Sequence, residues 1–198
     1  MVFEIYEAKD KRGKETIMNL MQLYTYELSF FEDDTCSFNL LDNGLYKMCK
    51  YTELYWKEEK RHPYILKYNG NLAGFVLVRF NEDGNYEIAE FFVLNKYRKL
   101  GAGTYMAIEM FKQFKGKWEI RTLLKNIRAQ EFWRKVVKKA SNGNFKEMKI
   151  RNNSRYAFYF ENRDFKDVIL KVKKFKLAIW MIIIVFVHWR KLVWIIIK

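Results

Sequence analysis

Two glycines, one residue apart, follow a pair of basic side chains in the segment Arg98-Lys99-Leu100-Gly101-Ala102-Gly103. We expect this segment to join a strand, Tyr86–Leu94, to a helix, Thr104–Phe114. Glycine lets the backbone turn tightly and approach a ligand, and the free N–H groups at a helix start attract an anion. The segment therefore predicts a cradle for a pyrophosphate, with Arg98 and Lys99 adding positive charge. The alternative is a plain strand-to-helix turn.

Two common phosphate-binding patterns do not fit the segment. Met106 stands where the dinucleotide-binding fingerprint needs its third glycine. No Lys-Ser or Lys-Thr pair follows Gly103, as a P-loop would require. The segment therefore matches neither pattern.

The segment resembles the Arg/Gln-x-x-Gly-x-Gly/Ala signature of the GNAT superfamily of N-acetyltransferases. The residues before it, Val93–Arg98, resemble the strand end that precedes this signature, with Asn95 where proline is commoner. Further on, Asn126-Ile127-Arg128-Ala129 followed by Phe132-Trp133 resembles the family's Asn-x-x-Ala-x-x-Phe-Tyr segment. The resemblance covers residues 1 to about 160.

This resemblance implies acetyl-CoA as cosubstrate and a strand, Phe91–Leu94, that splays from its neighbour to offer backbone groups to the pantetheine arm. Arg128 or Arg134 would reach a phosphate, unless both are simply solvated. The implied cofactor-binding residues are Phe92, Val93, Leu94, Arg98, Lys99, Leu100, Gly101, Ala102, Gly103, Thr104, Asn126, Ala129 and Trp133.

Acetyl transfer to an amine needs a base, and a carboxylate can serve. Glu90 lies within the otherwise apolar run Ile88–Val93, and burial of a carboxylate is costly without a partner or a task. Glu87 lies where histone-acetylating relatives place their base. Because the two are three residues apart in a strand, we expect them to face opposite sides. The alternatives are an ion pair for Glu90 with a core Arg or Lys, and a solvated strand end for Glu87.

Trp133 stands where the family often has a tyrosine that protonates the leaving thiolate. An indole N–H donates a hydrogen bond but is no general acid at physiological pH. We expect Tyr97, Tyr105 or water to serve, or no acid at all, because a thiol has a pKa of about 8.5.

Glu32, Asp33 and Asp34 form an acidic cluster between the first two expected helices. In the family this loop borders the acceptor pocket, and three carboxylates would attract a cationic amine. Tyr51 and Tyr55 would wall the same pocket. The alternatives are a solvated loop with an Asp helix cap, and aromatic residues that belong to the core.

The hydrophobic pattern predicts an α/β (α+β) fold with a mixed, mostly antiparallel sheet flanked by helices, in the order β-α-α-β-β-β-α-β-α-β-β. Asn69-Gly70 is the strongest hairpin signal in the chain. The expected strands are Val2–Ala8, Pro63–Tyr68, Leu72–Phe80, Tyr86–Leu94, Trp118–Leu124, Phe145–Ile150 and Arg155–Phe160, and the expected helices are Lys14–Phe31, Leu45–Lys60, Thr104–Phe114 and Arg128–Lys139.

The net charge of +14 is concentrated at one end of the chain. Residues 165–198 hold eight Lys or Arg and one Asp, a net of +7, and the remaining +7 is spread over the first 164 residues. The core therefore lacks the basic stripe that would track nucleic acid, and no nucleic-acid partner is expected. We expect residues 1–165 to form the acetyltransferase domain and 166–198 an extension.

The extension alternates basic and apolar stretches. Leu177–Val187 is too short to span a membrane, which needs about 20 apolar residues. Residues 171–198 would suit a membrane surface. A packed extra element and an accidental, non-native extension are the alternatives.

Two cysteines, Cys36 and Cys49, are too few for a disulfide scaffold and show no metal-ligand spacing, so no metal site is expected. The N-terminus lacks the pattern of a signal peptide. We expect a cytoplasmic protein with both cysteines reduced and buried. The sequence leaves open whether the protein forms a homodimer.

The sequence thus predicts an N-acetyltransferase that moves an acetyl group from acetyl-CoA to a primary amine by direct attack. A non-catalytic acyl-CoA-binding module and a membrane-associated interaction protein are the rival interpretations.

Overall fold

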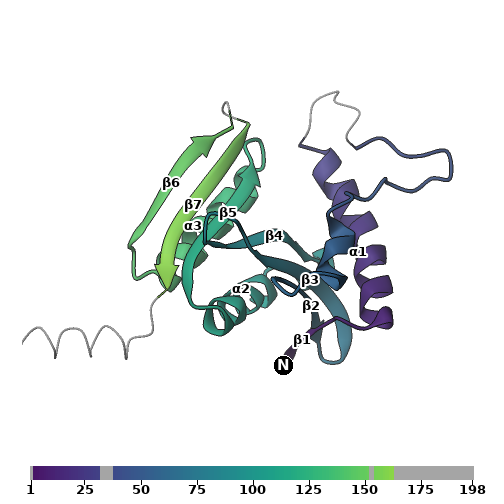
Figure 1. Cartoon of the computed structure of the whole chain (residues 1–198), viewed down its shortest axis with the longest axis horizontal. Coiled ribbons are helices and arrows are strands. Elements are labelled where there is room, and N and C mark those ends of the chain that lie inside the picture. Colours follow the sequence, from purple (N-terminus) through teal and green to yellow (C-terminus); the bar gives the residue numbers. More distant parts are fainter. Residues whose placement is uncertain (1, 32–37, 152–153, 163–198) are drawn as a thin grey trace, which may run out of the picture. The chain divides into compact units, whose positions relative to one another are not determined.

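The computed structural model describes residues 2–31, 38–151 and 154–162 (Figure 1). They contain a seven-stranded sheet in the order β1-β2-β3-β4-β5-β7-β6, in which only the β4–β5 pair is parallel. This confirms the predicted mixed, mostly antiparallel sheet. The strands are β1 Phe3–Glu7, β2 Arg61–Tyr68, β3 Asn71–Phe80, β4 Tyr86–Val93, β5 Gly116–Leu123, β6 Phe145–Ile150 and β7 Arg155–Asn162.

Helices cover both faces of the sheet, as predicted. On one face α1 (Lys11–Ser29) and the short 3-10 helix η2 (Thr52–Trp56) pack on an apolar cluster that includes Ile65 and Phe75. On the other face α2 (Ala102–Gln113) and α3 (Ile127–Ala140) pack on a second, larger cluster. We call these the α1 face and the α2–α3 face.

Local chemistry fixes the β2–β3 turn and the starts of α1 and α3, which begin before the predicted Lys14 and Arg128. Asn69 and Gly70 both adopt positive φ, 48° and 76°, and join β2 to β3 as the hairpin signal predicts. The side chain of Asp10 accepts a hydrogen bond from the Gly13 N–H at 2.8 Å and caps α1. Asn126 caps α3 in the same way, through the Ala129 N–H at 3.0 Å.

The predicted helix Leu45–Lys60 is wrong over most of its length. Only Thr52–Trp56 is helical, as the 3-10 turn η2. The side chain of Gln22 accepts from the Tyr46 N–H at 2.8 Å and donates to the Tyr46 carbonyl at 3.2 Å. These bonds, and a bridge between Tyr46 and Leu40, hold the backbone away from the helical path. A tertiary contact thus overrides the aromatic periodicity.

The prediction that Glu87 and Glu90 face opposite sides of β4 is also wrong. Leu77 pairs with Glu90, whereas Val78 pairs with Ile88, so Ala89 is an extra residue in a β-bulge. A bulge inserts one residue and shifts the alternation of side chains. Both carboxylates therefore lie on the α1 face, where each interacts with Tyr55 of η2.

Residues 1–162 form one compact unit. The predicted boundary at residue 165, the extension 166–198 and its membrane contact lie outside the described residues and stay predictions. Within the described residues no helix is long and apolar enough to cross a membrane. Cys49 is exposed, which contradicts its expected burial, and Cys36 lies outside the described residues.

Candidate active site

The parallel pairing of β4 with β5 ends early. Tyr86, Glu87 and Ile88 pair with Trp118, Glu119 and Ile120, and the pairing goes no further although both strands continue. The end of β4 therefore has backbone groups on its β5 side that no described strand pairs, which agrees with the expected splay. Phe92 and Val93 bury their side chains, so they can offer only their backbone to a ligand.

The segment that follows β4 turns sharply into α2. A short 3-10 turn η3, Asn95–Tyr97, leads to Lys99 and Gly101, whose φ angles are 64° and 87°. Gly101 is the N-cap of α2 and supplies no side-chain cap, so the amides of the first turn, Ala102 to Thr104, keep their N–H groups for another acceptor. A Cβ at Gly101 would meet no atom within 4 Å, so glycine is needed there for its conformation and not for space.

Gly103 has a different role. A Cβ built on it would approach the Phe132 ring of α3 at 3.2 Å, so the glycine lets the start of α2 lie against α3. Phe132 in turn packs against Trp133 and Phe91, with ring centroids 4.9 Å and 5.7 Å away. This aromatic cluster fixes the start of α2 relative to the end of β4. Trp133 is 4% exposed and belongs to the core of the α2–α3 face.

Arg98 is held by protein groups. Its Nε donates to the Val93 carbonyl at 2.7 Å, and its Nη2 donates to the Glu27 carboxylate of α1 at 2.7 Å and 2.5 Å. This guanidinium therefore ties the end of β4 to α1, and Glu27 offsets part of its charge. Lys99 and Leu100 are exposed beside the turn.

Glu90 is the carboxylate that could act as a base. The residue is half-buried on the α1 face and makes no ion pair with any described residue. Burial raises the pKa of Glu90 to about 7, from an ordinary value of 4.5, while a hydrogen bond from the Tyr24 hydroxyl acts in the opposite direction. Burial and the neighbouring Glu90 raise the pKa of Tyr24, which stays protonated and able to donate. A carboxyl that titrates near neutral pH suits proton transfer.

Glu87 is in a different position. It is 5% exposed, accepts from Arg79 at 2.9 Å and 2.7 Å, and lies 3.4 Å from Arg121. Arg121 also pairs with the buried Glu119, 2.7 Å away. The network therefore crosses β3, β4 and β5. The solvated strand end considered for Glu87 is excluded, and two guanidinium groups hold its charge in place.

The acceptor side is only partly described. Glu32, Asp33 and Asp34 lie outside the described residues. Tyr51 is 53% exposed, with the Lys50 ammonium 5.2 Å from its ring centroid. Tyr55 is 3% exposed and lies in the cluster on the α1 face. Of the two tyrosines, only Tyr55 is brought close to Glu90 by the fold.

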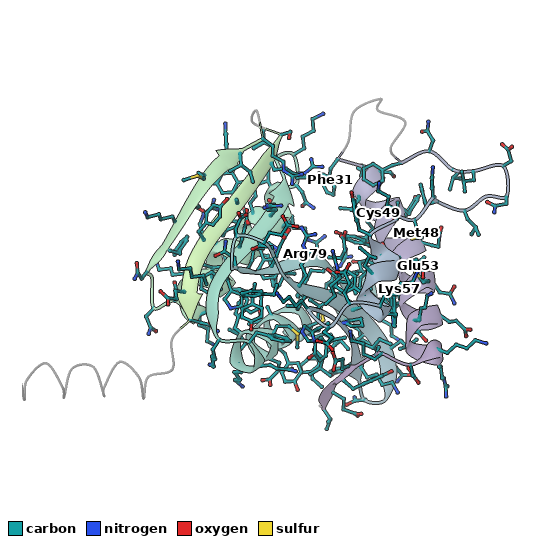
Figure 2. All side chains as sticks on the ribbon, viewed as in Figure 1. Phe31, Met48, Cys49, Glu53, Lys57 and Arg79 are labelled. Carbon is teal, nitrogen blue, oxygen red and sulfur yellow. The ribbon has the colours of Figure 1, made fainter. Side chains whose placement is uncertain are left out.

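Sequence reasoning missed Tyr24 and Arg79. Tyr24 falls on the apolar side of the expected helix Lys14–Phe31, and nothing in that pattern marks its hydroxyl as a partner of Glu90. Arg79, labelled in Figure 2, lies near the end of β3 and is the cross-strand partner of Glu87. The sequence could have predicted the pairing of Arg79 with Glu87. A hairpin in which Phe80 pairs with Tyr86 places residues 79 and 87 opposite each other. The described residues contain no group of three or more His, Cys, Asp or Glu side chains that could hold a metal ion.

Comparison with known proteins agrees with this geometry. The sequence pattern of the acetyltransferase (GNAT) family matches residues 20–137, more than half of the chain. No curated protein matches the chain.

Solved structures show the same fold at low sequence identity. An acetyltransferase from Thermus thermophilus has a TM-score of 0.58 at 9% identity, over 81% of this chain and 97% of the other. A GNAT-family acetyltransferase from Staphylococcus aureus Mu50 has a TM-score of 0.55 at 15% identity, over 82% and 100%. An aminoglycoside 6'-N-acetyltransferase complexed with coenzyme A has a TM-score of 0.52 at 12% identity, over 82% and 98%.

The matched residues 20–137 contain the splayed strand, the uncapped start of α2 and both carboxylates of β4. The chain belongs to the acetyltransferase (GNAT) family and is an acyltransferase with acetyl-CoA as its cosubstrate.

Proposed function

We propose that this protein transfers the acetyl group of acetyl-CoA to a primary amine by direct attack, with Glu90 as the general base. The observation that carries the proposal is the state of Glu90. It is half-buried on the α1 face, makes no ion pair with a described residue, and has a pKa that burial raises to about 7. Glu87, held by Arg79 and Arg121, lacks that freedom.

The residues around the splay fit acetyl-CoA. The uncapped N-terminus of α2, with Gly101 in the left-handed region, suits a pyrophosphate. The unpaired edge of β4 suits the amide groups of a pantetheine arm, which need donors and acceptors in line. Lys99 adds positive charge near the phosphates. Arg98 adds the part of its positive charge that its ion pair with Glu27 does not neutralise.

The acceptor is proposed to be a cationic small molecule or peptide. Glu32, Asp33 and Asp34 lie in sequence just beyond α1, the helix that carries Tyr24. An amine is mostly protonated at neutral pH and must lose a proton before it attacks. Glu90 would take this proton, and the released thiolate needs no strong acid because its conjugate thiol has a pKa of about 8.5.

A thiol-release assay with acetyl-CoA tests both parts of the proposal. The acceptor panel contains kanamycin, spermidine, a peptide with a free N-terminal alanine, and glutamate as an anionic amine. We expect a cationic amine to react fastest, and Glu90→Gln to lower turnover at pH 7 by at least tenfold. Preference for glutamate would contradict the acceptor class. Unchanged turnover in Glu90→Gln would contradict the base.

A non-catalytic acyl-CoA-binding module is the second candidate. Trp133 favours this candidate, because its buried indole occupies the position where the family often has a tyrosine that acts as a general acid. Calorimetry that shows acetyl-CoA binding, together with no thiol release for any amine of the panel, would support this candidate over the enzyme.

A further inference from the structure

The open end of β4 is in contact with a side chain of the loop that follows it. Along the β3–β4 pair, hydrogen-bonded and non-hydrogen-bonded positions alternate. The Leu94 N–H donates to the Ala73 carbonyl at 2.9 Å, so the backbone groups of the preceding residue, Val93, point away from β3. On that side the Val93 carbonyl accepts from Nε of Arg98 at 2.7 Å. Arg98 therefore lies on the open edge of β4, where the loop to α2 begins.

The other end of the Arg98 guanidinium is held by α1. Its Nη2 donates to both oxygens of Glu27, at 2.7 Å and 2.5 Å. Glu27 comes three residues after Tyr24, so the two side chains are neighbours on one side of the helix. The ring centroid of Tyr24 lies 5.8 Å from that of Phe92, and its hydroxyl is bonded to Glu90. Helix α1 thus holds β4 at two places, directly through Tyr24 and through Arg98 at the end of the strand.

A carboxylate in this position works against the binding of a phosphate, because it neutralises part of the charge of the loop arginine. The pair also adds little to the stability of the fold. The side chains of Arg98 and Glu27 are 22% and 39% exposed, and ion pairs between such groups contribute roughly 0–1 kcal/mol. What the pair does supply is geometry, because a guanidinium held at both ends fixes the backbone to which it is bonded.

We propose that Glu27 is a positioning residue for acetyl-CoA, which holds Arg98 on the Val93 carbonyl and so fixes the end of β4 relative to the start of α2. The inference rests on the proposed binding of acetyl-CoA at the β4 edge and the Gly101 turn, and it is independent of Glu90 as the base. The pantetheine arm and the pyrophosphate would bind two successive segments of backbone. A ligand that spans both segments gains affinity when their spacing is fixed in advance.

The sign of one mutational effect separates this role from the opposite one. Glu27→Gln removes a negative charge near the phosphates and keeps the size of the side chain. If Arg98 served mainly as a phosphate ligand, its release from Glu27 would tighten the binding of acetyl-CoA. We expect the reverse, an affinity about fivefold lower by calorimetry, because the strand end and the loop lose their common contact with α1. An unchanged or higher affinity in Glu27→Gln would overturn the proposal.

Glu53→Gln is the matched control. The Glu53 side chain is 42% exposed and pairs with Lys14 of α1 at 2.5 Å, in an ion pair that involves neither β4 nor the cofactor loop. Both variants should melt within about two degrees of the unmodified protein, and only Glu27→Gln should lose affinity for acetyl-CoA. Equal losses of affinity would mean that any broken ion pair of α1 loosens the site, which overturns the proposal. A loss of several degrees in Glu27→Gln alone would assign Glu27 to the fold and overturn it as well.

A double-mutant cycle with Arg98 completes the test. Arg98→Lys keeps the positive charge but loses the planar fork that reaches two acceptors at once. It should weaken acetyl-CoA binding about as much as Glu27→Gln does, and the double variant should bind no more weakly than Arg98→Lys alone, because both changes break the same link. Additive losses would show that Glu27 acts by another route, against the proposal.

The proposed cofactor site and the role of Glu27 can fail separately. Unchanged affinity for acetyl-CoA in Gly101→Val would refute the site itself. Affinity lost in Gly101→Val but kept in Glu27→Gln would leave the site in place and refute only the role of Glu27.

Discussion

Glu90 should lower the stability of the fold at alkaline pH, and the size of this effect follows from its environment. Burial raises the pKa of Glu90 to about 7, whereas an exposed glutamate in the unfolded chain has a value of 4.5. The folded protein therefore holds this proton more tightly than the unfolded chain does. The contribution of Glu90 to the free energy of unfolding is fully present below pH 4.5. It decreases as the pH rises toward 7, and it stays constant at higher pH.

The difference of about 2.5 pH units corresponds to about 3 kcal/mol at high pH. Between pH 5 and pH 9 the loss is about 2.5 kcal/mol, because part of it has already occurred at pH 5. Gln in place of Glu90 keeps the shape and an acceptor for Tyr24 but cannot ionise. Glu90→Gln should therefore be more stabilising at pH 9 than at pH 5 by this amount.

Urea unfolding of both proteins at the two pH values measures this difference without any knowledge of the acceptor. Glu59→Gln removes an exposed carboxylate and controls for the change in net charge. A stability difference between Glu90→Gln and the unmodified protein that is the same at both pH values would refute the reasoning. It would mean that Glu90 is ionised as easily in the fold as in water, and the case for it as base would weaken with it.

The remaining predictions concern the cofactor loop, Tyr24 and the chain end. Gly101→Val should lower the affinity for acetyl-CoA, measured by calorimetry, at least tenfold. Gly84→Val is the control, because Gly84 lies at a turn with equally open surroundings and a φ of 76°, so that the substitution causes backbone strain but should leave the affinity for acetyl-CoA unchanged. Equal affinities of the two variants would place the cofactor elsewhere. Tyr24→Phe should move the acidic limb of the pH–rate profile up by about one pH unit, because it removes the hydrogen bond that lowers the pKa of Glu90; an unmoved limb would exclude this bond. A chain ending at residue 165 should fold and bind acetyl-CoA, whereas a chain ending at residue 161 should lose several degrees in Tm. The second chain lacks Asn162, whose side chain accepts from two N–H groups of β5 and donates to two carbonyls at the end of α2. Equal melting temperatures of the two chains would contradict this role of Asn162.

Features set by neighbouring residues could be predicted from the sequence. Asn69-Gly70 specifies its own turn, because both residues tolerate positive φ. The left-handed Gly101 and the helix start after it follow from the same local chemistry. These features place the cofactor loop after β4, which is why the family signature and the structure agree.

Features set by distant residues could not be predicted in this way. The aromatic spacing of Leu45–Lys60 is helical, but Gln22 of α1 holds Tyr46 in another conformation. The shared face of Glu87 and Glu90 depends on one extra residue, Ala89, in a strand whose apolar run Ile88–Val93 shows no alternation. The pKa of Glu90 is raised by burial and lowered by the hydrogen bond from Tyr24, a residue 66 positions away in the chain. The base could therefore be nominated from sequence, but its environment could not.

The bulge at Ala89 also explains where the sheet opens. The last paired residue of β4 toward β5 is Ile88, and the extra residue comes immediately after it. A bulge bends its strand and increases the local twist, so the insertion turns β4 away from β5 at the point where the pairing stops. Deletion of Ala89 would keep both carboxylates on the same face and let the two strands continue side by side. One inserted residue, which a sequence alignment would record as a single gap, thus marks the place where a continuous sheet becomes an open one.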